Sequence, residues 1–116
     1  MAKVTGIGGV FFRSGNPDAL TLWYRTHLGI EAGQNPWATE AGPTVFAPFS
    51  ADSDYFPASQ QTMLNLRVDD MAGMIASLTA AGISVETRPE WDGEYGKFAH
   101  ISDPEGTKIE LWQPPA

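Results

Sequence analysis

The sequence contains two similar halves, and this internal repeat restricts the fold more than any other feature of the chain. Each half has a strand-like stretch, a helical stretch and a Gly-Ile step, at residues 10–13 and 28–30 in the first half and 64–67 and 81–83 in the second. From the arginine of the strand to the glycine after the helix there are 16 positions in the first half (Arg13 to Gly29) and 15 in the second (Arg67 to Gly82). Because each half continues with short strand-like stretches, the pattern predicts a β-α-β-β-β unit written twice. Two such units can close their sheets around a shared cavity, with the helices outside, so we expect an α+β fold.

Capping residues and turn residues set the expected boundaries of the two units. Asn16 and Pro17 are an N-cap and a first helical residue, which predicts a helix over Pro17–Leu28, and a second helix is expected over residues 70–81. Alternating or continuous apolar residues predict strands at residues 4–13, 31–39, 44–47, 63–68 and 83–87. We expect one domain over residues 1–116, with a first unit at about 4–49, a linker at about 50–61 and a second unit at about 62–114.

The C-terminal stretch, residues 98–114, has the pattern of a strand, a tight turn and a second strand. Pro104 and Gly106 are typical turn residues. The second strand places Ile109 and Leu111 on one face and Glu110 and Trp112 on the other. A carboxylate in the middle of a strand between large apolar residues ligates a cation, pairs with one, or lines a pocket.

The same stretch resembles the C-terminal signature of the vicinal oxygen chelate superfamily, Asp-Pro-(Asp/Glu)-Gly-Asn-x-Ile-Glu-Leu, with Thr107 at the Asn position. That superfamily contains glyoxalase I, extradiol dioxygenases, fosfomycin-resistance enzymes and bleomycin-resistance proteins. The resemblance implies the paired β-α-β-β-β fold over nearly the whole chain. It also implies that the position of Glu110 is a metal ligand in the metal-dependent members.

The rest of that metal-ligand set is missing from this chain. Carried over residue by residue, the ligand positions fall on Gly9, on Met63, near Thr44 or Phe46, and on Glu110. A catalytic site for a divalent metal needs about three protein ligands with an open position. Since Glu110 is the only good ligand among these positions, we expect no bound metal and no other cofactor.

Strand parity defines a candidate ligand-binding face. Phe11, Met63, Asn65, Glu110 and Trp112 would form its wall, with Arg67 at one end and Tyr95 over one mouth. The position of His100 depends on the turn. A turn over residues 103–106 would pair His100 with Ile109 and direct it away from Glu110, whereas a longer turn or a bulge would place it beside the carboxylate. Alternatively, these aromatic residues fill the interior and Glu110 pairs with Arg67 or Lys108.

Composition excludes several classes of partner. The net charge is −7, with 14 acidic and 7 basic residues, which argues against nucleic acid and anionic membranes as partners. The chain contains no cysteine, no apolar run of membrane-spanning length and no signal-peptide core, so we expect a cytoplasmic location. Tyr55 and Phe56 in the linker offer an apolar surface for a homodimer.

Three functions are compatible with these features. The one favoured by the missing metal ligands is a metal-free binding protein of the bleomycin-resistance type, which binds a small organic molecule in an aromatic-lined cavity. The second is a lyase or isomerase of the glyoxalase type that uses Glu110 as general base or metal ligand. The third is a structural or interaction protein without a small ligand.

Overall fold

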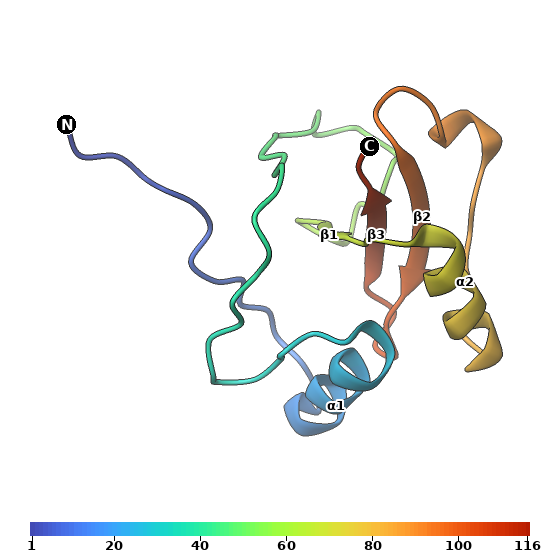
Figure 1. Cartoon of the computed structure of the whole chain (residues 1–116). Coiled ribbons are helices and arrows are strands. Elements are labelled where there is room, and N and C mark those ends of the chain that lie inside the picture. Colours follow the sequence, from blue (N-terminus) through green and yellow to red (C-terminus); the bar gives the residue numbers. More distant parts are fainter.

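The structure is a computed structural model that describes all residues, 1–116. It contains one three-stranded sheet, two α-helices and one short 3₁₀ helix (Figure 1). In chain order the elements are α1 (Pro17–Leu28), β1 (Leu64–Arg67), α2 (Met71–Ala80), η1 (Pro89–Trp91), β2 (Lys97–Ser102) and β3 (Lys108–Gln113). The strand order is β1-β3-β2, with β1 parallel and β2 antiparallel to β3. The α+β class predicted from the sequence is confirmed.

Both helices begin directly after a capping residue, Asn16 as predicted for α1 and Asp70 for α2, which is one residue shorter at each end than expected. The Asn16 side chain accepts a hydrogen bond from the backbone N–H of Ala19 at 3.2 Å, and the Asp70 side chain accepts one from Gly73 at 3.0 Å. These bonds satisfy donors that a helix leaves unpaired at its N-terminus. Gly29 ends α1 with a φ of 66°, in the left-handed region where glycine is favoured. Neither helix has the length and apolar character needed to cross a bilayer.

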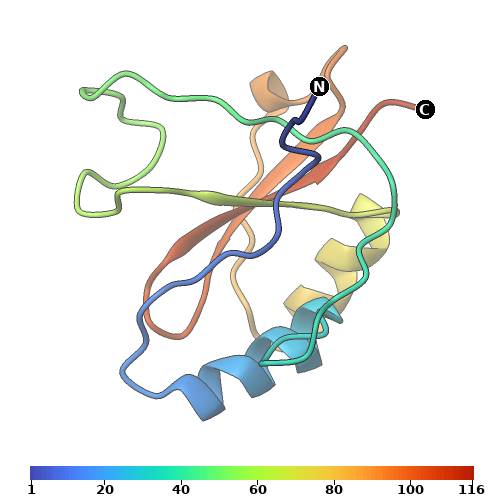
Figure 2. The same ribbon diagram turned by 90° about the vertical axis from the view of Figure 1, so that its left-hand side faces the viewer.

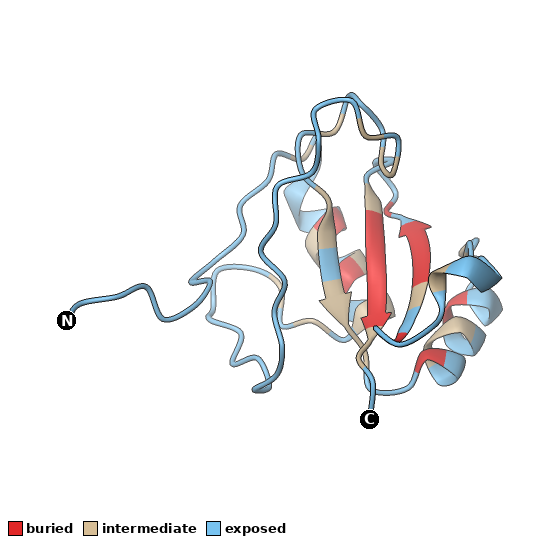
Figure 3. Ribbon diagram, turned by 90° about the horizontal axis from the view of Figure 1, so that it is seen from above, coloured by how far each residue is buried: buried red, intermediate tan, exposed pale blue.

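The two helices pack against one face of the sheet and form the core there. Figure 3 shows the buried residues gathered in β2, β3 and the inner sides of the helices. The core consists of residues from both helices and from the helix-facing side of the two strands: Leu20, Tyr24, Met71, Leu78, Ala99, Ile101, Ile109 and Leu111. Each large side chain buried there contributes about 1.5–3 kcal/mol to folding. The opposite face of the sheet is therefore left for the polar and aromatic residues.

The hairpin turn between β2 and β3 spans residues 103–107, one residue more than the expected turn over residues 103–106. Asp103 donates its backbone N–H to the carbonyl of Thr107 at 2.9 Å, so three residues lie between the paired ends. Gly106 has a φ of 84°, as expected for the last residue of a three-residue hairpin loop. The Asp103 carboxylate accepts hydrogen bonds from the backbones of Glu105 and Thr107 and stabilises this loop. As a result His100, and not Ala99, lies opposite Glu110. This corrects the register expected from a turn over residues 103–106.

The strands expected in the first unit are absent, and the strand expected at residues 83–87 of the second unit is reduced to a single bridge. Residues 1–15 and 33–63 run along the outside of the molecule without regular structure (Figure 2). Phe11 and Phe46 are 96% and 89% exposed. An isolated apolar stretch cannot form a strand without a partner for its backbone, and these stretches find none within the chain. Residues 83–87 pair with β2 only between Glu86 and His100. The closure of two sheets around a shared cavity stays a prediction.

Candidate functional site

The Glu110 carboxylate lies at the centre of a polar cluster on the sheet face that the helices leave free. Its residue is 6% exposed. Asn65 donates its side-chain N–H to one carboxylate oxygen at 2.8 Å, and the Nε2 atom of His100 lies 2.8 Å from the other. The Tyr55 hydroxyl donates to that same second oxygen. Segments far apart in the sequence thus converge on one carboxylate, which has no lysine or arginine partner.

The strand register explains why these residues meet. Asn65 of β1 and His100 of β2 are each the direct partner of Glu110 of β3, and Glu86 is the partner of His100. Residues directly opposite each other on neighbouring strands point to the same face. Glu86, His100, Glu110 and Asn65 therefore form one row across the sheet, and Tyr55 is added to it from the irregular segment 50–61.

Hydrogen bonds keep the Glu110 carboxyl ionised in spite of its burial. Burial alone raises the pKa of this carboxyl, but the hydrogen bonds from His100, Tyr55 and Asn65 favour the charged form, so that the pKa falls below its ordinary value. For Tyr55, burial and the hydrogen bond to Glu110 both raise the pKa of the phenol, which stays protonated. Because an ionised carboxylate only accepts hydrogen bonds, His100 carries a proton on Nε2.

Aromatic rings surround the imidazole of His100. The Trp91 ring lies 4.2 Å from the His100 ring between centroids, and the Tyr55 ring meets it edge-on at 5.1 Å. Arg88 lies over the Trp91 ring at 5.4 Å. The Nδ1 atom of His100 is buried without a hydrogen-bond partner. In the neutral ring this nitrogen is an acceptor, so the site holds an unused buried acceptor beside aromatic faces.

The segment that carries Tyr55 is fixed to the sheet by one other residue, Gln60. The Gln60 side-chain amide donates to the carbonyl of Lys108 at 2.9 Å and accepts from the Lys108 N–H at 3.0 Å. No backbone hydrogen bond joins residues 50–62 to the rest of the chain. The position of Tyr55 over Glu110 therefore depends on side-chain contacts alone.

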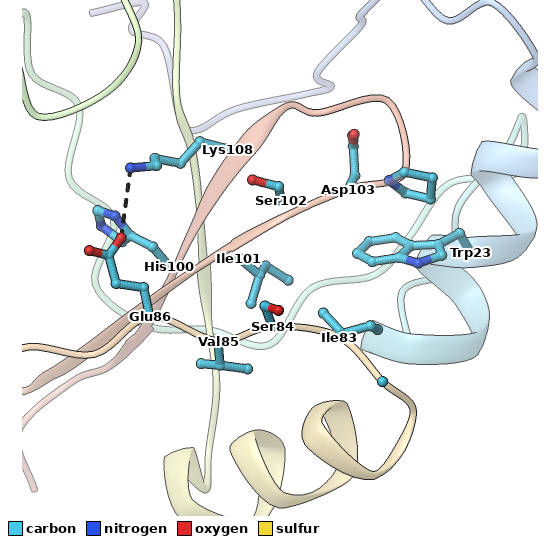
Figure 4. A pocket seen from close by; sticks show the side chains of 12 residues that line it. Trp23, Ile83, Ser84, Val85, Glu86, His100, Ile101, Ser102, Asp103 and Lys108 are labelled. Carbon is cyan, nitrogen blue, oxygen red and sulfur yellow. Dashed lines mark ion pairs between the residues drawn. The ribbon is translucent and has the colours of Figure 1, made fainter.

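A separate cavity of about 470 Å³ opens between residues 82–86 and β2 (Figure 4). It exists because residues 83–85 diverge from β2 beyond the Glu86–His100 pair, so that no backbone hydrogen bond joins Ser84 to Ser102. Trp23 of α1 lies at one end and His100 at the other, near the ion pair between Lys108 and Glu86 at 3.9 Å. This cavity contacts the polar cluster only through His100.

The structure brings together some of the predicted site residues. Asn65, His100 and Glu110 are in direct contact, and Met63 begins the stretch that leads into β1. Trp112 and Arg67 form the next row of the same face, where the Trp112 indole donates to the carbonyl of Tyr95. Arg67 binds the carbonyls of Glu40 and Pro43 and does not pair with Glu110. Lys108 is paired with Glu86, so neither expected cation holds the Glu110 carboxylate.

Phe11 and Tyr95 lie outside both rows, and two members of the cluster were missed. Phe11 is exposed in the N-terminal segment, and Tyr95 is 72% exposed and contributes only its carbonyl. Tyr55 and Trp91 were not predicted, since both lie in irregular segments without a strand parity. The only signal for them was the presence of large aromatic residues in two polar stretches.

The residues present do not fit the metal of the metal-dependent superfamily members. Glu110 and His100 are the only metal-ligating side chains in the cluster, and the Nε2 atom of His100 is hydrogen-bonded to the Glu110 carboxylate. No group of three or more His, Cys, Asp or Glu side chains has a geometry that could hold a metal ion. Gly9 lies in the exposed N-terminal segment, where the nearest side chain to it is Phe11.

Comparison with known proteins identifies the family. The antibiotic-binding protein TnmS3 from Streptomyces sp. CB03234 has the same fold, with a TM-score of 0.65, 24% identity and coverage of 99% of this chain and 100% of that one. A glyoxalase/bleomycin resistance protein from the same organism is 38% identical over 43% of this chain and 42% of its own, with a TM-score of 0.38. A protein from Agrobacterium tumefaciens is 20% identical over 87% of this chain and 90% of its own, with a TM-score of 0.49. No curated protein matches the sequence significantly. The model of the glyoxalase-like domain matches residues 9–112, and the chain therefore belongs to the glyoxalase-like domain family.

Proposed function

We propose that the chain binds a small, flat organic molecule at the polar cluster around Glu110, without a metal ion. The observation that carries this proposal is the buried, ionised carboxylate with aromatic rings beside it and no lysine or arginine partner. Sites for small organic ligands are typically apolar and aromatic, with a few polar groups that fix orientation. The fold shared with an antibiotic-binding protein supports the same direction.

Thermal unfolding with and without ligand tests the proposal. A ligand that binds only the folded state stabilises it by RT ln(1 + [L]/Kd), about 2.7 kcal/mol at a concentration of 100 Kd. We expect naphthalene-type probes to raise the Tm of the natural protein, and Trp91→Ala to reduce this shift because it removes the ring beside His100. Leu22→Ala is the matched control, since Leu22 is an exposed residue on α1. Equal shifts in the two variants would place the ligand elsewhere.

Metal analysis of the dialysed protein is the second arm of the test. We expect less than stoichiometric Ni, Mn, Fe or Zn, because one carboxylate paired with one imidazole leaves most of a coordination sphere to water. If the natural protein retains one equivalent of metal and Glu110→Ala does not, the proposal of metal-free binding is wrong and a metal-dependent function is supported.

One observation favours an enzyme of the lyase or isomerase type as a second candidate. Glu110 is a poor general base, because its pKa is lowered. His100, however, is oriented by a carboxylate at Nε2 and has a free Nδ1, which is the arrangement of a general base. Such a base would exchange the acidic C–H of a small α-hydroxy ketone with solvent deuterium, which NMR detects. Exchange lost in His100→Gln would support this function, and exchange at the uncatalysed rate would exclude it for that substrate.

We also propose that two copies of the chain associate. Tyr55 and Phe56 are partly buried within the chain and do not provide the surface, contrary to the sequence-based expectation. Instead, large apolar residues of the unpaired segments are exposed: Val4, Ile7, Val10, Phe11, Phe12, Trp37, Val45, Phe46 and Phe49. Exposed apolar area of this kind is typical of protein–protein contacts. A second copy offers the missing strand partners, because it carries the same unpaired segments and the same sheet edge at β1.

A further inference from the structure

The Tyr55 side chain occupies the position over Glu110 that a bound molecule would need. Its hydroxyl donates to the carboxylate oxygen that also faces His100. Its ring contacts His100 edge-on at 5.1 Å, Trp91 at 6.2 Å and Phe49 at 5.7 Å between centroids. Each of these contacts is one that a flat aromatic ligand with a hydroxyl group would make at the same place.

The segment that carries Tyr55 is held in a way that allows it to move aside. Its two backbone hydrogen bonds, from Ser53 to Ser50 and from Gln60 to Pro57, are internal to the segment. Its polar attachments to the sheet are the Tyr55 hydroxyl and the Gln60 amide. Removal of Tyr55 from Glu110 would therefore break no strand pairing.

The cluster has more acceptors than donors, and this fixes the chemistry of what can replace Tyr55. Glu110 offers two oxygens that accept, and the buried Nδ1 of His100, which has no partner, is a further acceptor in the neutral ring. The donors that belong to the sheet are Asn65 and the Nε2–H of His100. Loss of the Tyr55 hydroxyl leaves the second carboxylate oxygen with the His100 donor alone, so that one of its lone pairs is left for a donor on the incoming molecule.

The charge around the site excludes an anionic ligand. Glu110 has no lysine or arginine partner, and Glu86 in the same row is already paired with Arg88 and Lys108. A carboxylate or phosphate beside Glu110 would meet like charge in a buried site. A neutral group that only accepts, such as an ether, would not replace the hydrogen bond that Tyr55 donates to Glu110.

We propose that the ligand is an uncharged, flat aromatic molecule that carries a hydroxyl group, and that it displaces the Tyr55 phenol and donates to Glu110. This inference rests on the proposed binding function and names the ligand class. In the free protein, Tyr55 makes the hydrogen bond to Glu110 that the ligand makes in the complex. The residue that selects the hydroxyl is Glu110, and the residues that select the flat ring are Trp91 and His100.

Three probes of one shape test the inference: 2-naphthol, 2-methoxynaphthalene and 2-naphthoate, with Kd measured by calorimetry and by Trp fluorescence. In the natural protein we expect 2-naphthol to bind about tenfold more tightly than the methyl ether, as for loss of one hydrogen bond to a charged group. We expect no binding of 2-naphthoate. Tyr55→Phe should strengthen the binding of 2-naphthol and of the ether by a similar factor, because either probe then displaces a ring that no longer donates to Glu110. The ratio of the two affinities should stay the same. Glu110→Gln should remove the preference for the hydroxyl.

Tyr24→Phe is the matched control. It also removes a phenol hydroxyl that donates to a carboxylate, that of Asp103 at 2.9 Å, but on the helix-covered face. It should lower stability without strengthening the binding of either probe.

The outcomes separate the inference from the function on which it rests. Equal affinity for 2-naphthol and its ether, in the natural protein and in Tyr55→Phe, would overturn the hydroxyl preference while leaving an aromatic binding site. This comparison in the natural protein needs no variant to fold. Absence of binding by all three probes would overturn both the ligand class and the proposed function.

Discussion

Replacement of Glu110 by alanine should destabilise the protein strongly, because it removes the acceptor of three hydrogen bonds from three separate segments. Tyr55 is half-buried and Asn65 is exposed, so both side chains can form hydrogen bonds to water instead. His100 is 2% exposed, and its other nitrogen is already unpaired, so it would have no partner at all. The main cost of Glu110→Ala is therefore the isolation of His100.

The expected loss is about 3 kcal/mol at pH 7. One lost hydrogen bond to a charged group accounts for about 1.5–3 kcal/mol, and burial of an unsatisfied donor for about 1–3 kcal/mol. We take values near the lower end of both ranges, because removal of the carboxylate also removes the free-energy cost of burying a charge. Against a total stability of about 5–15 kcal/mol for a domain, this is a large fraction. Glu110→Gln keeps the shape and one acceptor, so its loss should be about half as large.

Urea unfolding of the natural protein and both variants, followed by circular dichroism, measures these losses as shifts of the midpoint at constant slope. The pH dependence supplies a second check. Since the pKa of Glu110 in the folded state lies below its ordinary value of 4.5, its stabilisation is fully present above that pH and is lost as the pH falls through the folded-state pKa. The difference between the natural protein and Glu110→Gln should therefore narrow below pH 4.5. A loss under about 0.5 kcal/mol, or a difference that stays constant with pH, would refute this account.

Three further predictions concern other parts of the molecule. Tyr24→Phe should lower the free energy of unfolding by about 1.5–3 kcal/mol, because the buried phenol donates to the Asp103 carboxylate. The pKa of Tyr24 is raised by burial and by that hydrogen bond, so the difference should shrink above pH 10 as the unfolded chain ionises, which urea titrations at pH 7 and pH 11 would reveal. Gly96→Ala should cost at least about 2 kcal/mol in the same assay, because the φ of Gly96 is 115° and a Cβ would lie 2.2 Å from the carbonyl oxygen of Gln113. A neutral substitution would contradict this close approach of Gly96 to Gln113. Light scattering at tens of micromolar should give a dimer mass, and Phe46→Asp should shift it towards the monomer; a monomer mass for the natural protein would count against association.

The second half of the chain was largely predictable from local signals, because its elements carry caps and alternation that act over a few residues. The N-cap of α2 and the alternation of Ile109, Glu110 and Leu111 specify a helix and a half-polar strand without reference to distant residues. The register of the hairpin was not predictable with the same certainty. It depends on one residue of loop length, which is set by the Asp103 carboxylate and by the left-handed conformation of Gly106.

The candidate site was predictable only in part, because it is built from contacts that no local pattern encodes. Parity placed Asn65 and Glu110 on one face, and the alternative register placed His100 there as well. Tyr55 contacts Glu110 across 55 positions of the chain, from a segment without the apolar periodicity of a strand or a helix. The failure at Phe11 has the opposite cause, since its strand signal is strong but no strand in the same chain pairs with it.

The attachment of residues 50–61 through Gln60 has a consequence for the speed of binding. The Gln60 amide makes hydrogen bonds to both backbone groups of Lys108, as the backbone of a paired strand would. Unlike strand pairing, these bonds can break by rotation about the side-chain bonds of Gln60 alone. Side-chain rotations and loop motions take nanoseconds to microseconds, whereas collective backbone rearrangements take microseconds to milliseconds. We therefore expect the ligand to be admitted at close to the rate of diffusional encounter, so that its residence time, and not its entry, sets the affinity.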